Sequence, residues 1–128
     1  HNNHYYNGVG VQSVYLGSYT RIDGTVVSGA FLADLVAGSD SDLDAEMRTK
    51  LSATIRELGD IKHAAEAGFA YDMMIQAGNA AGEDLIMGGV KAFIDQTRSI
   101  VRVVAVLDVD AIAIVGSDSL DDPDALFQ

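Results

Sequence analysis

The first 24 residues, HNNHYYNGVGVQSVYLGSYTRIDG, hold two of the three histidines and four of the five tyrosines. Imidazole and phenol rings both donate and accept hydrogen bonds, so these side chains suit a pocket or an interface. The candidates for such a site are His1, His4, Asn7, Tyr15 and Tyr19. On residue type alone, a terminal histidine is more often solvated than functional. The other four are favoured as packing and hydrogen-bonding residues around it.

The carboxylates of Asp40, Asp42 and Asp44 alternate along the chain, as they do at the start of a calcium-binding loop. Such a loop also needs glycine at its sixth position and glutamate at its twelfth. This chain has Ala45 and Leu51 at those positions. We therefore expect the three carboxylates to face water and cap the start of a helix, and we expect no calcium site.

Two other spacings could carry chemistry. His63 and Glu66 are three residues apart, which on a helix lets an imidazole and a carboxylate meet one metal ion. We favour solvated residues near a helix end over a metal site at this position. Gly8 and Gly10 form too short a pattern for a dinucleotide-binding loop, which needs a third glycine and a preceding strand.

Two long segments show helical periodicity, which predicts an all-α fold built as a helical bundle. The first covers about residues 41–65, and Gly68 is expected to terminate it. The second covers about residues 82–107, after a break near residues 78–82. Their apolar faces are Leu43, Met47, Leu51, Ile55, Leu58 and Ile61 in the first, and Ile86, Val90, Phe93, Thr97, Ile100, Val104 and Leu107 in the second.

The rest of the chain divides around these helices. We expect residues 1–27 to form an irregular head, because four glycines oppose a continuous helix there. Residues 28–107 are expected to be helical, with a shorter helix at residues 29–37. We expect residues 108–128 to form an acidic C-terminal arm, and an ordered or semi-ordered arm is favoured there over a cation site. Two long helices cannot cover each other's apolar faces, so we expect a partner surface from outside the chain.

Composition excludes several classes of function. The net charge is −11 with only eight lysines and arginines, which argues against binding nucleic acid or an anionic membrane surface. No apolar run approaches the roughly 18 residues that a membrane-spanning helix needs. The chain has no cysteine, which removes disulfides and thiolate metal sites from consideration.

His1, Asn7 and the run GVQSVYLGSY at residues 10–19 resemble the second half of the imelysin-like proteins. These are bacterial cell-envelope proteins that include iron-regulated envelope proteins and proteins classed as M75 metallopeptidases. In that family a Ser-Asp-x-Thr-His element leads into a stretch similar to YYNxxGxxxVYLGxYxRxDG. His1 would be the last residue of this element. The resemblance implies the C-terminal part of a longer protein, which is the second half of a two-bundle helical fold.

The resemblance also implies a site and a location. His1, with Asn7, Tyr15 and Tyr19, would line a ligand pocket on the face where the missing N-terminal half docks. The family's Gly-x-His-x-x-Glu signature lies in that other half, and His63 does not meet it because Ile61 stands two residues before it. The implied location is the periplasm or the outer membrane, with that N-terminal half as partner.

Two functions follow from the resemblance, and a third needs no site. The first is a binding or accessory protein linked to iron uptake, for which iron or another divalent metal would be the cofactor of the full-length protein. The second is part of an M75 metal-dependent peptidase whose ligands lie mainly in the N-terminal half. The chain carries no complete catalytic constellation, so we favour the first. The third is a helical scaffold without a site of its own.

Overall fold

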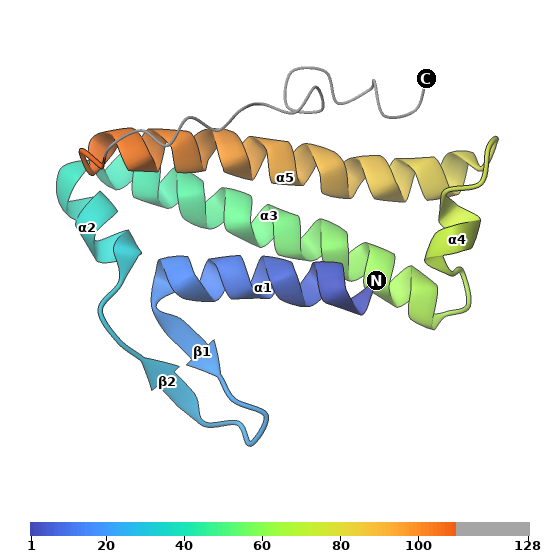
Figure 1. Ribbon diagram of the computed structural model, residues 1–128, viewed down its shortest axis with the longest axis horizontal. Coiled ribbons are helices and arrows are strands. Elements are labelled where there is room, and N and C mark those ends of the chain that lie inside the picture. The colour runs from blue at the N-terminus through green and yellow to red at the C-terminus, as the bar shows by residue number, and fades with distance from the viewer. Residues whose placement is uncertain (110–128) are drawn as a thin grey trace.

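The computed structural model describes residues 1–109, so all but the first two residues of the expected acidic arm lie outside the described residues. Helices dominate this part of the chain, and the only sheet within it is a hairpin of two three-residue strands (Figure 1). The all-α helical bundle is therefore confirmed. The elements in chain order are α1 (Asn2–Leu16), β1 (Ser18–Thr20), β2 (Val26–Ser28), α2 (Leu32–Ser39), α3 (Ser41–Glu66), α4 (Tyr71–Met74) and α5 (Ala80–Val106).

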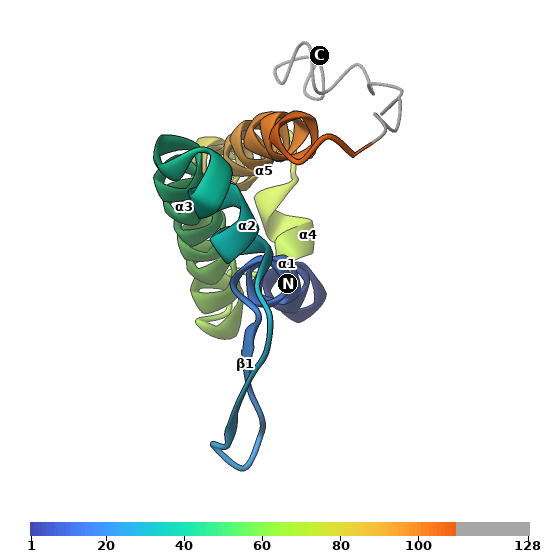
Figure 2. The same ribbon diagram turned by 90° about the vertical axis from the view of Figure 1, so that its left-hand side faces the viewer.

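Helix α3 is the centre of the bundle, because both α1 and α5 pack along it. The helices α1 and α5 barely contact each other. Viewed along the bundle, α3 lies on one side, and the short helix α4 lies between α1 and α5 at one end (Figure 2). The arrangement leaves the facing sides of α1 and α5 uncovered along much of their length.

Helix α3 forms where its periodicity predicted it. The side chain of Asp40 accepts a hydrogen bond from the Leu43 backbone N–H at 2.9 Å, which caps the first turn as expected. Beyond its last residue, Gly68 adopts a φ of 99°, a conformation that favours glycine. The expected apolar face is buried at Leu43, Met47, Leu51, Leu58 and Ile61.

Helix α5 also matches its predicted range, but the side of it that faces α3 differs from the expected one. The buried positions include Gly82, Gly89, Gln96 and Val103, which recur every seven residues. The expected stripe is only half-buried at most positions and borders the gap between α1 and α5. Small residues allow a closer approach to α3, since a Cβ added at Gly89 would lie 3.2 Å from the Ile61 side chain.

The prediction of an irregular head was wrong. Residues 2–16 form the helix α1, and residues 18–28 contain the hairpin. The glycine at position 8 is tolerated because α1 packs against α3 there, and an added Cβ would lie 2.8 Å from the Leu58 Cδ1 atom. Tertiary packing therefore outweighs the low helix propensity of glycine. Gly17 ends the helix with a φ of 60°.

The hairpin projects away from the helices (Figures 1 and 2). Its strands pair antiparallel with Tyr19 opposite Val27, and every residue of both strands is exposed. Ile22 in the connecting loop is also fully exposed. A two-stranded hairpin is marginally stable by itself, so these exposed apolar side chains mark a surface that another element can cover.

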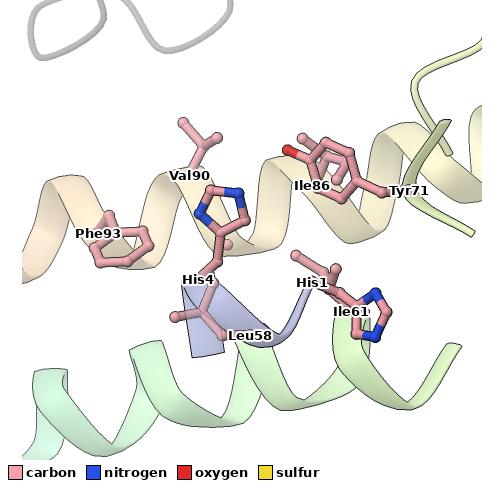
Figure 3. A pocket seen from close by; sticks show the side chains of 9 residues that line it. His1, His4, Leu58, Ile61, Tyr71, Ile86, Val90 and Phe93 are labelled. Carbon is pink, nitrogen blue, oxygen red and sulfur yellow. The ribbon is translucent and has the colours of Figure 1, made fainter. Parts of the chain in front are cut away.

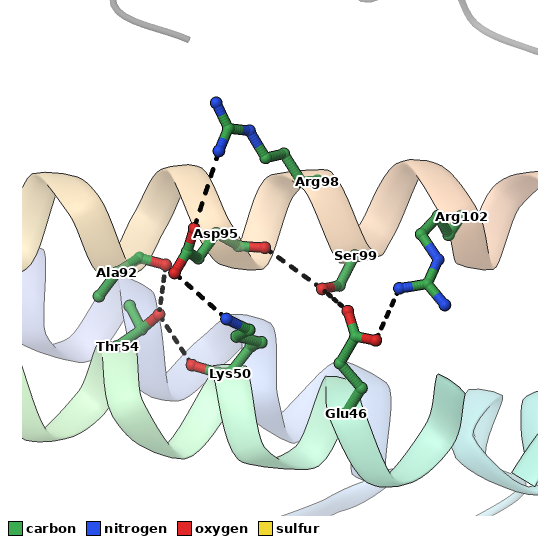
Figure 4. A network of polar contacts seen from close by, with 8 residues as sticks. All are labelled: Glu46, Lys50, Thr54, Ala92, Asp95, Arg98, Ser99 and Arg102. Atoms are coloured by element: carbon green, nitrogen blue, oxygen red, sulfur yellow. Dashed lines mark hydrogen bonds and ion pairs between the residues drawn. The ribbon is translucent and has the colours of Figure 1, made fainter. Parts of the chain in front are cut away.

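Polar contacts hold α3 to α5 on the solvent side (Figure 4). Arg102 donates to the Glu46 carboxylate at 2.6 Å, and the Ser99 hydroxyl donates to it at 2.8 Å. Further along, Lys50 donates to Asp95 at 3.2 Å. These contacts fix the relative register of the two helices.

The Glu46 contacts predict a pH dependence of stability. The hydrogen bonds from Arg102 and Ser99 lower the pKa of Glu46 from its ordinary value of 4.5. A carboxyl whose pKa is lower in the folded state contributes stability that is complete above its unfolded pKa and is lost as the pH falls through its folded pKa. We expect the free energy of unfolding, measured in urea, to fall less between pH 7 and pH 3 in Glu46→Gln than in the parent chain. An equal fall in both proteins would contradict this.

Candidate functional site

A cavity of about 200 Å³ opens between α1, α3, α4 and α5 (Figure 3). Its polar side chains are those of His1 and His4 at the start of α1 and Tyr71 at the start of α4. The remainder of the wall is apolar apart from backbone. It consists of Leu58, Ile61, Ile86, Gly89, Val90 and Phe93.

The two histidines are positioned by different means. The ring of His4 stacks on the ring of Tyr71, with 5.9 Å between centroids and 27° between planes. The position of Tyr71 is fixed by Met74, which lies in the same four-residue helix and is buried in the core at 1% exposed. His1 precedes the first turn of α1, and its carbonyl accepts the backbone N–H of Tyr5 at 3.2 Å. The cavity therefore combines an apolar floor with two imidazole rings.

A second cavity, of about 230 Å³, lies toward the opposite end of the same gap. Its walls are almost entirely apolar. They include Val11 and Val14 of α1, Leu32 of α2, Ile100 and Val104 of α5, and Leu107, which caps the end of α5. Because it has no charged lining residue, this cavity suits an apolar segment better than a metal ion or an anion.

The four predicted pocket residues do not gather at one place. His1 lines the first cavity, but Tyr15 is 14 residues further along α1, about 21 Å away at the helical rise. Asn7 is exposed on α1, and Tyr19 is exposed on β1. The residue that accompanies His1 in the cavity is His4, another of the candidates from the head of the sequence.

Tyr15 is instead part of a buried polar cluster in the core. Its hydroxyl donates to Asp44 Oδ1 at 2.9 Å, and Arg48 donates to Asp44 Oδ2 at 2.9 Å. Burial raises the pKa of the Tyr15 hydroxyl, and the bond to the Asp44 carboxylate raises it further. The expectation that Asp44 faces water was wrong, because Asp44 is 9% exposed and joins α1 to α3.

This cluster yields a prediction for stability. Tyr15→Phe removes the hydroxyl that donates to the Asp44 carboxylate, while Arg48 still neutralises the charge. The free energy of unfolding should fall by about 1–2 kcal/mol, the usual cost of a buried polar group that loses one partner. Tyr19→Phe is the matched control, since Tyr19 is 53% exposed, and it should leave stability unchanged. Similar denaturation curves for the two variants would contradict the assignment.

The sequence pattern of the Imelysin (peptidase M75) family matches residues 1–100. The chain belongs to the Imelysin family. The match covers α1 to α4 and most of α5, including every residue that lines the first cavity. No curated protein matches this imelysin chain. None of the described helices combines the length and apolar character needed to cross a membrane.

The remaining candidate ligands of this imelysin chain lie apart from the cavity. His63 and Glu66 are in the last turn of α3, where Glu66 forms an ion pair with Lys62 at 2.7 Å. Asp40 is occupied as the cap of α3. Within residues 1–109, no three histidine, aspartate or glutamate side chains gather closely enough to hold a metal ion.

Sequence reasoning missed the contribution of α4 to the imelysin cavity. Met74 is the buried methionine of this helix, at 1% exposed, whereas Met73 is 41% exposed. Tyr71 is the only tyrosine outside the first 24 residues, and this isolated position was the one sequence feature that could have pointed to it as a cavity residue. A four-residue helix has too few turns to show periodicity, so its buried face could not be identified.

Proposed function

We propose that the chain is the C-terminal part of an imelysin-like binding or accessory protein of the bacterial cell envelope, linked to iron uptake. In this proposal it is the second half of a two-bundle fold and resides in the periplasm or at the outer membrane. The observation that carries the proposal is that His1 and His4 both line one cavity whose remaining wall is apolar apart from Tyr71 and backbone. Imidazole is a ligand that iron and other divalent metals accept.

A complete metal site would need more ligands than these two imidazoles. We assign the others to the N-terminal half, which is the proposed partner. That half would dock over the mouth of the cavity and along the exposed hairpin, where Tyr19, Ile22 and Val26 lack cover. When bound, the metal would supply a positively charged centre for ligand oxygen or nitrogen atoms.

The test uses the full-length protein that contains this segment, with Fe²⁺ and Zn²⁺ as probes in calorimetry. His1→Ala and His4→Ala should each weaken binding at least about tenfold, because losing even a residue that only supports a metal ligand costs about that much. The melting temperature should stay nearly unchanged, because His1 and His4 are exposed in this chain. His63→Ala is the control, since His63 lies outside the cavity, and its affinity should equal that of the parent.

Lower stability with unchanged metal affinity in His1→Ala and His4→Ala would make both histidines structural and would refute the proposal. The second candidate is an M75 metal-dependent peptidase, favoured by the same two imidazoles, which are also zinc ligands. It predicts peptide hydrolysis by the full-length protein that stops on chelation and returns with Zn²⁺. Metal binding without hydrolysis supports the binding protein instead.

A further inference from the structure

The apolar cavity between α1 and α5 remains unused by the proposed function. Several of its lining side chains stand in solvent although they are apolar, with Val14 75%, Val11 39% and Leu32 38% exposed. Contiguous exposed apolar surface marks a place where another segment docks. We term this surface the α1–α5 groove, defined by Val11, Val14, Leu32, Ile100, Val104 and Leu107.

The C-terminal end of α5 turns the chain toward this groove. The backbone N–H of Val109 donates to the Val104 carbonyl at 3.4 Å, and that of Asp108 donates to the Ala105 carbonyl at 3.3 Å. Asp108 itself adopts the left-handed conformation, with a φ of 52°. This combination is a Schellman motif, in which the residue after the left-handed position typically packs on the helix it has just left.

The side chain that follows the turn already lies at the groove. Val109 and Val104 both line the groove. These two residues occupy the positions that a Schellman motif brings into contact. Val109 is nevertheless 56% exposed, so the groove is only partly closed by it. The groove therefore continues from the last described residue of the chain.

We propose that the α1–α5 groove is the docking site of residues 111–115 of the same chain, AIAIV. A single residue, Asp110, separates this segment from Val109. Five residues span about 16 Å when extended, which is enough to follow the groove along the two turns of α5 between Ile100 and Leu107. The tether makes the docking intramolecular, so it needs no partner at high concentration.

Charge supports this occupant over the rest of the tail. The segment AIAIV carries no charge, whereas Asp118, Asp121, Asp122 and Asp124 follow it. Carboxylates in a groove without a charged or polar partner would lose their hydration without compensation. The apolar segment therefore fits the groove, and the acidic residues fit the solvent beyond it.

The absence of tryptophan from the chain provides a direct test. Ile114→Trp introduces one fluorophore into the proposed docked segment, and Leu120→Trp places the same fluorophore in the acidic segment as a matched control. We expect blue-shifted emission from Ile114→Trp and an acrylamide quenching constant about threefold lower than that of Leu120→Trp, because packed surroundings exclude the quencher. Equal emission maxima and equal quenching would overturn the proposal.

A groove variant and dilution separate this proposal from its rivals. Adding Val14→Asp to Ile114→Trp should raise quenching to the level of the control. Because Val14 is 75% exposed, this change should leave the fold intact, and circular dichroism checks that it does. Protection that disappears on dilution would place the segment in a second copy and overturn the proposal. Protection that survives Val14→Asp would place it elsewhere and overturn it too. Neither result bears on metal binding by His1 and His4.

Discussion

Replacing Leu51 with alanine is expected to lower the free energy of unfolding by about 2–5 kcal/mol, the range for removing a buried leucine side chain from a packed core. Leu51 is 1% exposed and packs in one cluster with Tyr15, Val36, Met47 and Val103. This cluster joins α1, α2, α3 and α5, so a cavity there weakens four elements at once. Urea denaturation followed by circular dichroism measures the effect.

Val101→Ala is the control for this prediction. Val101 lies on α5 and is 50% exposed, so its truncation should change stability by no more than about 0.5 kcal/mol. A loss below about 1 kcal/mol for Leu51→Ala would mean that the cluster is not the packed centre of the bundle.

Gly82→Ala is expected to destabilise the chain by about 1–3 kcal/mol, the cost of forcing an extra methyl group into a packed site. An added Cβ at Gly82 would overlap the backbone of Met74, including its carbonyl oxygen. Backbone cannot rotate away as a side chain can, so α4 and α5 must separate. Because α4 carries Tyr71, which stacks on His4, the same change should also loosen the wall of the first cavity.

The matched control is Gly10→Ala. Gly10 also lies inside a helix, but an added Cβ there meets no atom within 4 Å. Removing a helix-interior glycine without a clash should raise stability by about 0.5–1 kcal/mol. The two substitutions are thus chemically identical and should shift the denaturation midpoint in opposite directions. A stabilised Gly82→Ala variant would contradict the close contact between α4 and α5.

Gly88 and Gly89 lie where α5 approaches α3 closely. An added Cβ would meet the Glu57 carboxylate from Gly88 and the Ile61 side chain from Gly89. The sequence could indicate that a helix approaches, since glycines in a helix interior otherwise cost stability. It could not indicate which helix, because that depends on contacts between residues distant in the chain.

The sequence by itself determined the fold class, the family resemblance and the ranges of α3 and α5. These depend on local periodicity and capping, such as the bond from the Leu43 N–H to Asp40, which a short stretch of chain contains in full. Only the tertiary structure decided that residues 2–16 form a helix despite Gly8, and that His1 lines a cavity with His4 and Tyr71 and not with Tyr15. The physical reason is that packing between segments far apart in the chain outweighs local propensity, and residues at opposite ends of one rigid helix cannot share a pocket.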